Sequence, residues 1–201
     1  MLSQEDVTGL VLSGGRGQRM GGIDKGLQIL HGRPLFLHAV ERLQPQTASI
    51  LVSANRHLHI YEKAGFPVVS DDVANAFAGP LAGFLAGLMH CQTPFMVTVP
   101  CDCPFYPATL VPELKTALLQ NDADIAIAVT GLEAPFSPQP VFCLMRRQLQ
   151  PHLSAFLQSG QRKIDHWFSG LKVAHAHFEN EADFYNINTA EALQKLESRP
   201  L

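Results

Sequence analysis

A glycine-rich loop with interspersed cations follows the first apolar run of the chain. The run Thr8–Leu12 is predicted to form a buried strand, and the loop after it contains glycines at positions 14, 15, 17, 21 and 22. Glycine lets a backbone approach a ligand closely, and successive N–H groups in such a loop can be aimed at one anion. Arg16, Arg19 and Lys25 add positive charge. This combination favours the binding of a triphosphate.

The loop differs from two well-known phosphate-binding motifs. Lys25 follows Asp24, and no serine or threonine comes after it, so the P-loop pattern is absent. The dinucleotide fingerprint is nearly present, but Gly21 comes one residue late and the arginines would crowd a pyrophosphate. Segment 12–25 instead resembles the signature loop of nucleotidyltransferases. The alternative is a solvated glycine-rich turn with incidental cations.

An aspartate follows the most apolar run, Phe95–Val99, within the segment Pro100–Pro104. In open α/β sheets, ligands bind beyond the carboxyl ends of the strands, so we expect Asp102 to face the glycine-rich loop. Mg²⁺ usually takes one or two carboxylates together with phosphate oxygens and water, which makes Asp102 a predicted metal ligand; a turn cap is the alternative. Asp71 follows another predicted strand and could bind Mg²⁺ or a nucleoside donor, with Asp72 as its rival.

The cysteines and histidines show no strong metal-binding pattern. Cys101 and Cys103 flank Asp102, but a C-x-C pair without a second pair is a weak zinc signal, and we expect both side chains to pack inside the protein. The histidines are scattered, and we interpret them as satisfied or exposed. His175 and His177 could face one side of a late strand.

Composition limits the classes of protein to consider. The chain has 201 residues, 46% hydrophobic and 16% charged, which excludes a disordered chain and predicts a single domain over residues 1–201. A net charge of −3 supplies no general attraction for nucleic acid or anionic lipid. Met1–Asp6 lacks the basic region of a secretory signal, and no apolar run is long enough for a membrane span. The four cysteines show no disulfide framework, so we expect reduced thiols and a cytoplasmic location.

Apolar runs alternate with helical patterns, which predicts an α/β fold with a mostly parallel sheet. The expected strands are Thr8–Leu12, Ser49–Ser53, Val68–Ser70, Phe95–Val99, Ile125–Val129, Val141–Met145 and Val173–Ala176. The expected helices are Pro34–Leu43, His57–Ala64, Leu81–Met89, Pro107–Leu119, Arg146–Gln158 and a last one from its cap Thr189 to about Glu197. Gly83 and Gly87 give one helix a small face for close packing on the sheet, and Gly131–Pro138 is expected to be a loop.

Further motifs follow the loop in a fixed order: Gly79–Gly83, Pro100–Pro104 and Asn186–Thr189. Together they resemble the molybdenum cofactor guanylyltransferase family over nearly the whole chain. The segments Gly21–Gly26 and Ala54–Arg56 are more particular to this family than the loop, which many nucleotidyltransferases share. The resemblance implies a three-layer, Rossmann-like nucleotidyltransferase fold with one antiparallel strand toward the C-terminal half. It also implies a nucleotide-binding part over about residues 1–130 and an acceptor-side part over about 131–201.

The resemblance also implies an activity: Mg²⁺-dependent transfer of GMP from GTP to Mo-molybdopterin, with release of pyrophosphate. The implied catalytic residues are Arg19, Lys25 and Asp102, of which Asp102 holds the Mg²⁺. The implied nucleotide-binding residues are Leu12, Ser13, Gly14, Gly15, Lys25, Asn55, Asp71 and Asp102. Asn186 and Asn188 are implied to bind the acceptor. Implied protein partners are other proteins of molybdenum-cofactor biosynthesis and chaperones of apo-molybdoenzymes; we expect neither nucleic acid nor a membrane as a partner.

The sequence departs from the family pattern at two positions that the resemblance places near the nucleoside. Ser13 stands where alanine is usual, and Ser53 stands where relatives carry an asparagine that touches the nucleoside. A serine is shorter and has a single donor, so the choice between GTP and CTP stays open at this position. Asn55 could compensate.

Several other functions share part of this set of motifs. A molybdopterin cytidylyltransferase or a sugar-phosphate nucleotidyltransferase would share the loop and Asp102. A non-catalytic cofactor carrier would need no metal carboxylate. A Rossmann oxidoreductase needs an acidic residue at the end of the second strand, and Ser53–Asn55 offers none. A phosphate acceptor is already anionic near pH 7, which suits a sequence without an obvious His–Asp or Ser–His pair.

Overall fold

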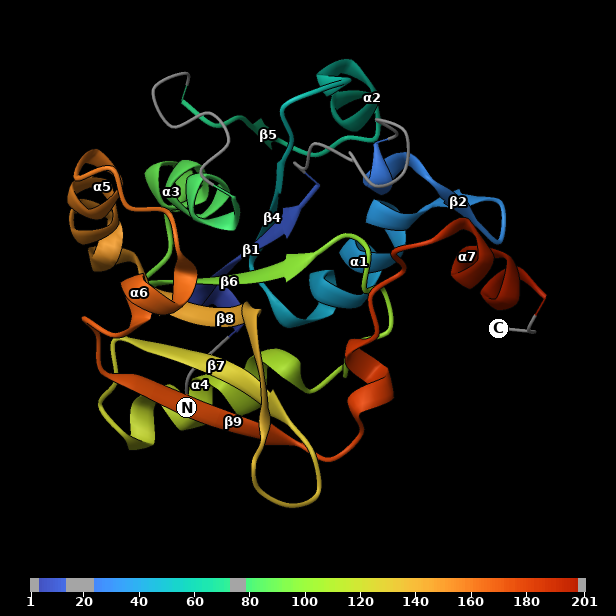
Figure 1. The fold of residues 1–201 in the computed structure, drawn as a ribbon. Helices are drawn as coiled ribbons and strands as arrows, with labels where there is room; N and C mark the ends of the chain where they lie inside the picture. Colours follow the sequence, from blue (N-terminus) through green and yellow to red (C-terminus); the bar gives the residue numbers. More distant parts are fainter. Residues whose placement is uncertain (1–3, 14–23, 73–78, 199–201) are drawn as a thin grey trace.

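A seven-stranded sheet forms the centre of the computed structural model, which describes residues 4–13, 24–72 and 79–198 (Figure 1). The strands follow the order β5-β4-β1-β6-β8-β7-β9 across the sheet. Their bounds are β1 Val7–Leu12, β4 Ser49–Ser53, β5 Val68–Val69, β6 Phe95–Pro100, β7 Ile125–Thr130, β8 Ser137–Arg146 and β9 Val173–Phe178. A separate two-stranded hairpin is formed by β2 (Ile29–Leu30) and β3 (Arg33–Pro34).

Helices cover both faces of the sheet, so the architecture has three layers (Figure 1). Helices α1 (Leu35–Leu43) and α4 (Leu110–Gln120) share a hydrophobic core with one face. Helices α3 (Pro80–His90), α5 (Gln150–Gln158) and α6 (Ile164–Phe168) share the core on the other. Two further helices are α2 (Leu58–Lys63) and α7 (Ala190–Glu197), and short 3₁₀ turns include η3 (Lys25–Leu27) and η6 (Arg147–Leu149).

The direction of the strands confirms the predicted fold class. Strands β5, β4, β1 and β6 pair in parallel, and so do β7 and β9. Strand β8 is antiparallel to both of its neighbours, β6 and β7. Strands β1 and β6 are apolar along almost their whole length because helices bury both faces of the sheet.

Strand β8 begins earlier than the sequence predicted. Segment 131–138 was expected to be a loop, but β8 already pairs with β7 at Ser137 and Pro138. The register between the two strands shifts next to Ile127 and Ala128, and prolines are tolerated in strands at such irregularities. Pro140 lies where the register shifts and Pro138 pairs with Val129, so neither proline ends the strand.

Two helix boundaries also differ from the prediction. The helix expected from Pro107 begins at Leu110, because residues before it form a turn in which Leu110 N–H donates to the Pro107 carbonyl. The helix expected over Arg146–Gln158 is shorter, since β8 extends to Arg146 and η6 precedes α5. Helix α6 was not predicted, since five residues are too few for a clear helical period.

The glycines of α3 pack against the sheet as expected, and Gly87 has the least space. A Cβ atom at Gly87 would lie 2.6 Å from Leu10 Cδ2 and 2.8 Å from Met96 Sδ. We predict that Gly87→Ala lowers the free energy of unfolding by about 1–2 kcal/mol, because overpacking outweighs the gain in helix propensity. Urea denaturation measures this. Gly170→Ala is the control, since its Cβ would meet nothing closer than 3.6 Å, and an equal loss in both variants would contradict the prediction.

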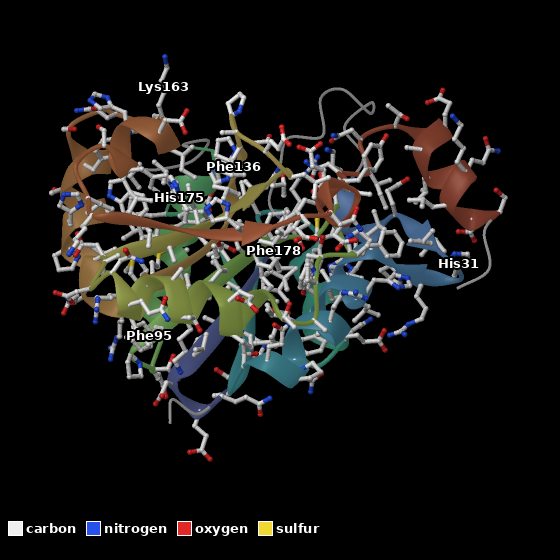
Figure 2. All side chains as sticks on the ribbon, turned by 90° about the horizontal axis from the view of Figure 1, so that it is seen from below. His31, Phe95, Phe136, Lys163, His175 and Phe178 are labelled. Atoms are coloured by element: carbon white, nitrogen blue, oxygen red, sulfur yellow. The ribbon has the colours of Figure 1, made fainter. Side chains whose placement is uncertain are left out.

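The C-terminal helix α7 packs on the β2–β3 hairpin. Thr189 caps it as predicted, its Oγ1 accepting from Ala192 N–H at 3.1 Å. Leu193 of α7 packs against a small cluster that includes Ile187. The hairpin turn joins the same contact, because His31 N–H donates to Glu197 Oε2 at 2.7 Å; Figure 2 labels His31 beside this helix. The chain before α7 is thereby held next to the hairpin. No helix in the described ranges is both long and apolar enough to cross a membrane.

Candidate active site

The site lies where β1 and β6 end side by side. These strands are parallel, with Leu12 paired to Pro100, so both end at the same edge of the sheet. Cys101 N–H donates to the Leu12 carbonyl at 3.1 Å, which extends the pairing by one residue. Asp102 therefore follows β6 next to the point where Ser13 follows β1, as the sequence predicted.

Lys25 lies between two segments that are distant in sequence. Its Nζ donates to Asp102 Oδ2 at 3.0 Å and to Asn188 Oδ1 at 2.6 Å. The Lys25 side chain is 29% exposed and that of Asp102 is 16% exposed, so both stay accessible to a ligand. A predicted phosphate-binding cation, a predicted metal ligand and a predicted acceptor residue thus meet at one ammonium group.

A main-chain hydrogen bond adds a second connection between the same segments. Ile187 N–H donates to the carbonyl of Asp102 at 2.7 Å. Ile187 is buried, whereas Asn186 and Asn188 on either side of it are exposed. The alternation turns both asparagine side chains away from the core while the backbone between them is fixed to the Asp102 loop.

Asn55 and Asp71 form a pair beyond β4 and β5. Asn55 Nδ2 donates to Asp71 Oδ2 at 2.8 Å, and Asp71 N–H donates to Asn55 Oδ1 at 2.9 Å. Burial raises the pKa of Asp71, and the hydrogen bond from Asn55 opposes that rise. The two predicted nucleoside-binding residues therefore act as one polar unit at the carboxyl end of the sheet.

Ser53 has a different environment from Asn55. It is 1% exposed, and a Cβ at Gly83 would lie 2.9 Å from Ser53 Oγ, so the hydroxyl is covered by α3. Ser13 is also buried; its N–H donates to the Ser53 carbonyl at 2.8 Å, and its Oγ has no hydrogen-bond partner among the described residues. Of Ser53 and Asn55, only the asparagine is exposed at this edge.

Asp24 and Tyr61 were not singled out by sequence reasoning. Asp24 is buried next to Lys25 and caps η3, its side chain accepting from Gly26 N–H. Tyr61 reaches it from α2. An aspartate directly before a helical turn is a capping signal, which could have identified Asp24; no sequence pattern indicates the tyrosine.

Several predicted residues lie outside the described ranges. They are Gly14, Gly15, Arg16, Gly17 and Arg19, which belong to the glycine-rich loop. Their predicted roles in binding phosphates and in catalysis remain predictions.

A cavity of about 370 Å³ lies on the side of Lys25 formed by the C-terminal half of the chain. Its lining includes Asn186 and Asn188, together with Thr130, Ser137, Gln139, Glu181, Phe184, Tyr185, Thr189 and Ala192. A second hollow of about 800 Å³ is lined by Phe95 and Arg146 at the opposite end of β6. The smaller cavity is the one that adjoins the ammonium of Lys25, through Asn188.

The cysteines beside Asp102 pack into the protein, as expected. Cys101 is 4% exposed and Cys103 is fully buried, and both belong to the hydrophobic core under α1 and α4. Burial raises the pKa of Cys103 to about 12 and raises that of Cys101 further. Both thiols therefore stay protonated near neutral pH. His175 and His177 are exposed on the same side of β9, also as expected; Figure 2 labels His175 on this strand.

These features define a nucleotidyltransferase: an α/β sheet in which an ammonium and a carboxylate meet beyond the strand that enters a glycine-rich loop. A family model described as the MobA-like NTP transferase domain matches residues 9–176, and the chain belongs to that family.

Relatives match this chain over nearly their full lengths. It is 51% identical to a molybdenum cofactor guanylyltransferase from Bordetella petrii, over 98% of this chain and 100% of the relative. It is 49% identical to one from Cupriavidus pinatubonensis, with 98% and 100% covered. A solved structure from Archaeoglobus fulgidus, described as molybdopterin-guanine dinucleotide biosynthesis protein A, superposes with a TM-score of 0.74 at 22% identity, covering 94% of this chain and 96% of that one. This last similarity concerns the fold.

Proposed function

We propose that this protein transfers GMP from GTP to Mo-molybdopterin, forming molybdopterin guanine dinucleotide and releasing pyrophosphate. Relatives of that name at about 50% identity over nearly the whole chain support the proposal. The observation that carries it is the position of Lys25, whose Nζ contacts both Asp102 and Asn188. A cation between a metal-type carboxylate and an acceptor-side amide is suited to phosphoryl chemistry between two anionic substrates.

On this proposal the nucleotide occupies the edge of the sheet beyond β1, β4 and β5. Leu12, Ser13, Gly14, Gly15, Asn55 and Asp71 bind it, while Lys25 and Arg19 hold its triphosphate. In the Asn55–Asp71 pair, Asn55 is exposed and Asp71 is half-buried, and the pair keeps hydrogen-bonding capacity for a base or ribose, whereas Ser53 is covered. Asn55 would therefore take over the contact that relatives make with the asparagine at the position of Ser53.

The acceptor occupies the cavity of about 370 Å³ beside Asn186 and Asn188. Most of its lining comes from residues 130–192, which supports an acceptor-side part over about 131–201 and a nucleotide-binding part over about 1–130, within one domain. Gln139 is half-buried and donates to the buried Thr130 Oγ1 at 3.3 Å, and its remaining amide groups offer hydrogen bonds for a polar heterocycle.

Asp102 fits a magnesium ion shared with the substrate. In the described part of the chain, no group of three or more His, Cys, Asp or Glu side chains could hold a metal on its own. Mg²⁺ commonly binds through one or two carboxylates plus phosphate oxygens and water, so a single carboxylate beside the triphosphate suffices. When bound, the ion would neutralise charge on the phosphates.

The remaining chemistry is positioning and electrostatics. The terminal phosphate of the acceptor is already anionic near pH 7, so the reaction requires no general base to create the nucleophile. Lys25 and Arg19 reduce the repulsion between the two anions and stabilise charge on the departing pyrophosphate. The site holds one substrate on each side of the Lys25 ammonium, which lowers the entropy cost of bringing the two together.

Asn188 is predicted to affect both substrates. We expect Asn188→Ala to weaken Mg·GTP binding about five-fold, because Lys25 loses a hydrogen bond with a net value of about 1 kcal/mol. Asn186→Ala is the matched variant: it should weaken acceptor binding and leave GTP affinity within two-fold. Calorimetric titration with GTP in the absence of acceptor separates the two, and an equal GTP affinity in both variants would count against this role.

We also propose a cytoplasmic location, supported by four buried, unpaired cysteines. Proteins that supply Mo-molybdopterin or receive the dinucleotide, including chaperones of apo-molybdoenzymes, are the proposed protein partners.

Pyrophosphate release tests the proposed function. Purified protein is mixed with Mo-molybdopterin, Mg²⁺ and each of GTP, CTP, ATP and UTP in turn. We expect pyrophosphate with GTP, together with the guanine dinucleotide product. Release with CTP alone would identify a cytidylyltransferase instead, and binding without release would identify a carrier.

A further inference from the structure

A buried carboxylate lies directly next to Lys25 and is not used by the chemistry described above. The side chain of Asp24 is 6% exposed, although a buried carboxylate is costly unless it is well hydrogen-bonded. Its Oδ1 accepts from Tyr61 Oη at 2.7 Å and from Gly26 N–H at 3.2 Å. Its Oδ2 lies 3.3 Å from His57 Nδ1.

Gly26 makes this contact possible. A Cβ atom there would lie 2.6 Å from Tyr61 Oη and 3.1 Å from Ser13 Cβ. The backbone of η3 therefore approaches the tyrosine hydroxyl as closely as a residue without a side chain permits. Asp24 and Gly26 are the residues on either side of Lys25, so both neighbours of the lysine lie against the same hydroxyl.

Tyr61 is itself firmly placed. It is fully buried, and its ring packs edge-on against Phe36 of α1, with ring centroids 4.7 Å apart at 67°. The hydroxyl thus projects from a core that includes Phe36 of α1 toward Asp24.

We propose that the Asp24–Tyr61 hydrogen bond is a positioning device for Lys25, a role that rests on the proposed function. It fixes the residues on both sides of the lysine, and the lysine side chain reaches Asp102 and Asn188. A lysine has a long, flexible side chain, and anchoring its backbone limits the volume in which the ammonium can lie. Tyr61 and Asp24 act on the triphosphate through Lys25 and touch no substrate.

Tyr61→Phe tests this because it removes the hydroxyl and keeps the ring. We expect Mg·GTP affinity to fall about ten-fold and GMP affinity to fall less than two-fold, since Lys25 is proposed to hold the phosphates beyond the first. The matched control is Tyr106→Phe. Tyr106 is equally buried in the same core, and its hydroxyl donates to the Ala39 carbonyl at 2.5 Å, away from Lys25. Both variants should shift the urea midpoint by similar amounts, while Tyr106→Phe should leave both nucleotide affinities within two-fold.

A double variant tests whether Tyr61 acts through the lysine. In a Lys25→Ala background, adding Tyr61→Phe should change GTP affinity by less than two-fold, because coupled residues are not additive. A further ten-fold loss, or equal losses for GTP and GMP in Tyr61→Phe alone, would overturn the positioning role.

Different results would disprove the proposed function and the positioning role of Tyr61 and Asp24. If the wild-type protein releases no pyrophosphate from GTP and Mo-molybdopterin, the proposed function is wrong and the positioning role falls with it. If the wild-type protein is active and Tyr61→Phe behaves like Tyr106→Phe, only the positioning role is wrong.

Discussion

Asp102→Asn is expected to lower turnover by about 100- to 1,000-fold while reducing Mg·GTP affinity by less than ten-fold. The amide has the shape of the carboxylate but lacks its charge, which is the property that a hard divalent ion requires. Charge on the phosphates grows as the reaction proceeds, so loss of this carboxylate costs more in the transition state than in the bound ground state. Steady-state rates and equilibrium titrations of the same preparation measure the two quantities.

The control for Asp102 is an aspartate with no link to the site. Asp165→Asn changes an exposed carboxylate on α6, and its turnover should match that of the wild type. Equal losses of turnover and affinity in Asp102→Asn would mean that the carboxylate contributes to ground-state binding alone. Unchanged turnover would remove Asp102 from the catalytic residues.

Lys25→Ala is expected to reduce kcat/KM for GTP roughly 30- to 1,000-fold, which corresponds to a loss of about 2–4 kcal/mol in transition-state stabilisation. Its Nζ is the group that Asp102 and Asn188 share, so its loss leaves two oxygen-bearing side chains without their common donor. The second cation assigned to the triphosphate, Arg19, should show a loss in the same range on Arg19→Ala. Steady-state kinetics with varied GTP at saturating acceptor measure the effect.

Lys163→Ala controls for a general loss of positive charge. Lys163 precedes α6, and Figure 2 shows its side chain extended away from the molecule. This variant should keep the kcat/KM of the wild type. A Lys25→Ala variant with wild-type kinetics would contradict the role of the ammonium. A comparable loss in Lys163→Ala would show that net charge, and not position, is the cause.

The sequence was sufficient to predict the fold class and the position of Asp102 beside the point where β1 ends. Both follow from one rule, because the carboxyl ends of neighbouring parallel strands share an edge. The order of apolar runs identified β1 and β6, and β1 proved to lie directly beside β6. Burial on both faces gives such strands a strong and unambiguous pattern.

The prediction was weaker where local residue preferences oppose the tertiary structure. Pro138 was placed at the end of a predicted loop, yet it lies within β8, where pairing with Val129 of β7 overrides the local preference. The boundary at Leu110 was placed too early because proline favours the first turn of a helix without fixing where that turn begins.

Contacts between distant side chains were beyond the sequence. Asn188 was assigned to the acceptor, but nothing in its spacing indicated the hydrogen bond to Lys25. The sequence does not predict the Tyr61–Asp24 hydrogen bond either, since a tyrosine in a short helix is consistent with ordinary core packing. Both contacts depend on how α2 and the segment before α7 are placed against η3, which only the assembled fold determines.

The hydrogen bond from Ile187 N–H to the Asp102 carbonyl involves only main-chain atoms. Substituting either side chain would leave both partner atoms in place, with proline at position 187 as the exception. The segment that carries Asp102 and the segment that carries the two asparagines are therefore joined by a bond that does not depend on the identity of either side chain. Residues around the proposed acceptor cavity can vary to suit a different heterocycle while the cavity keeps its position relative to Lys25 and Asp102.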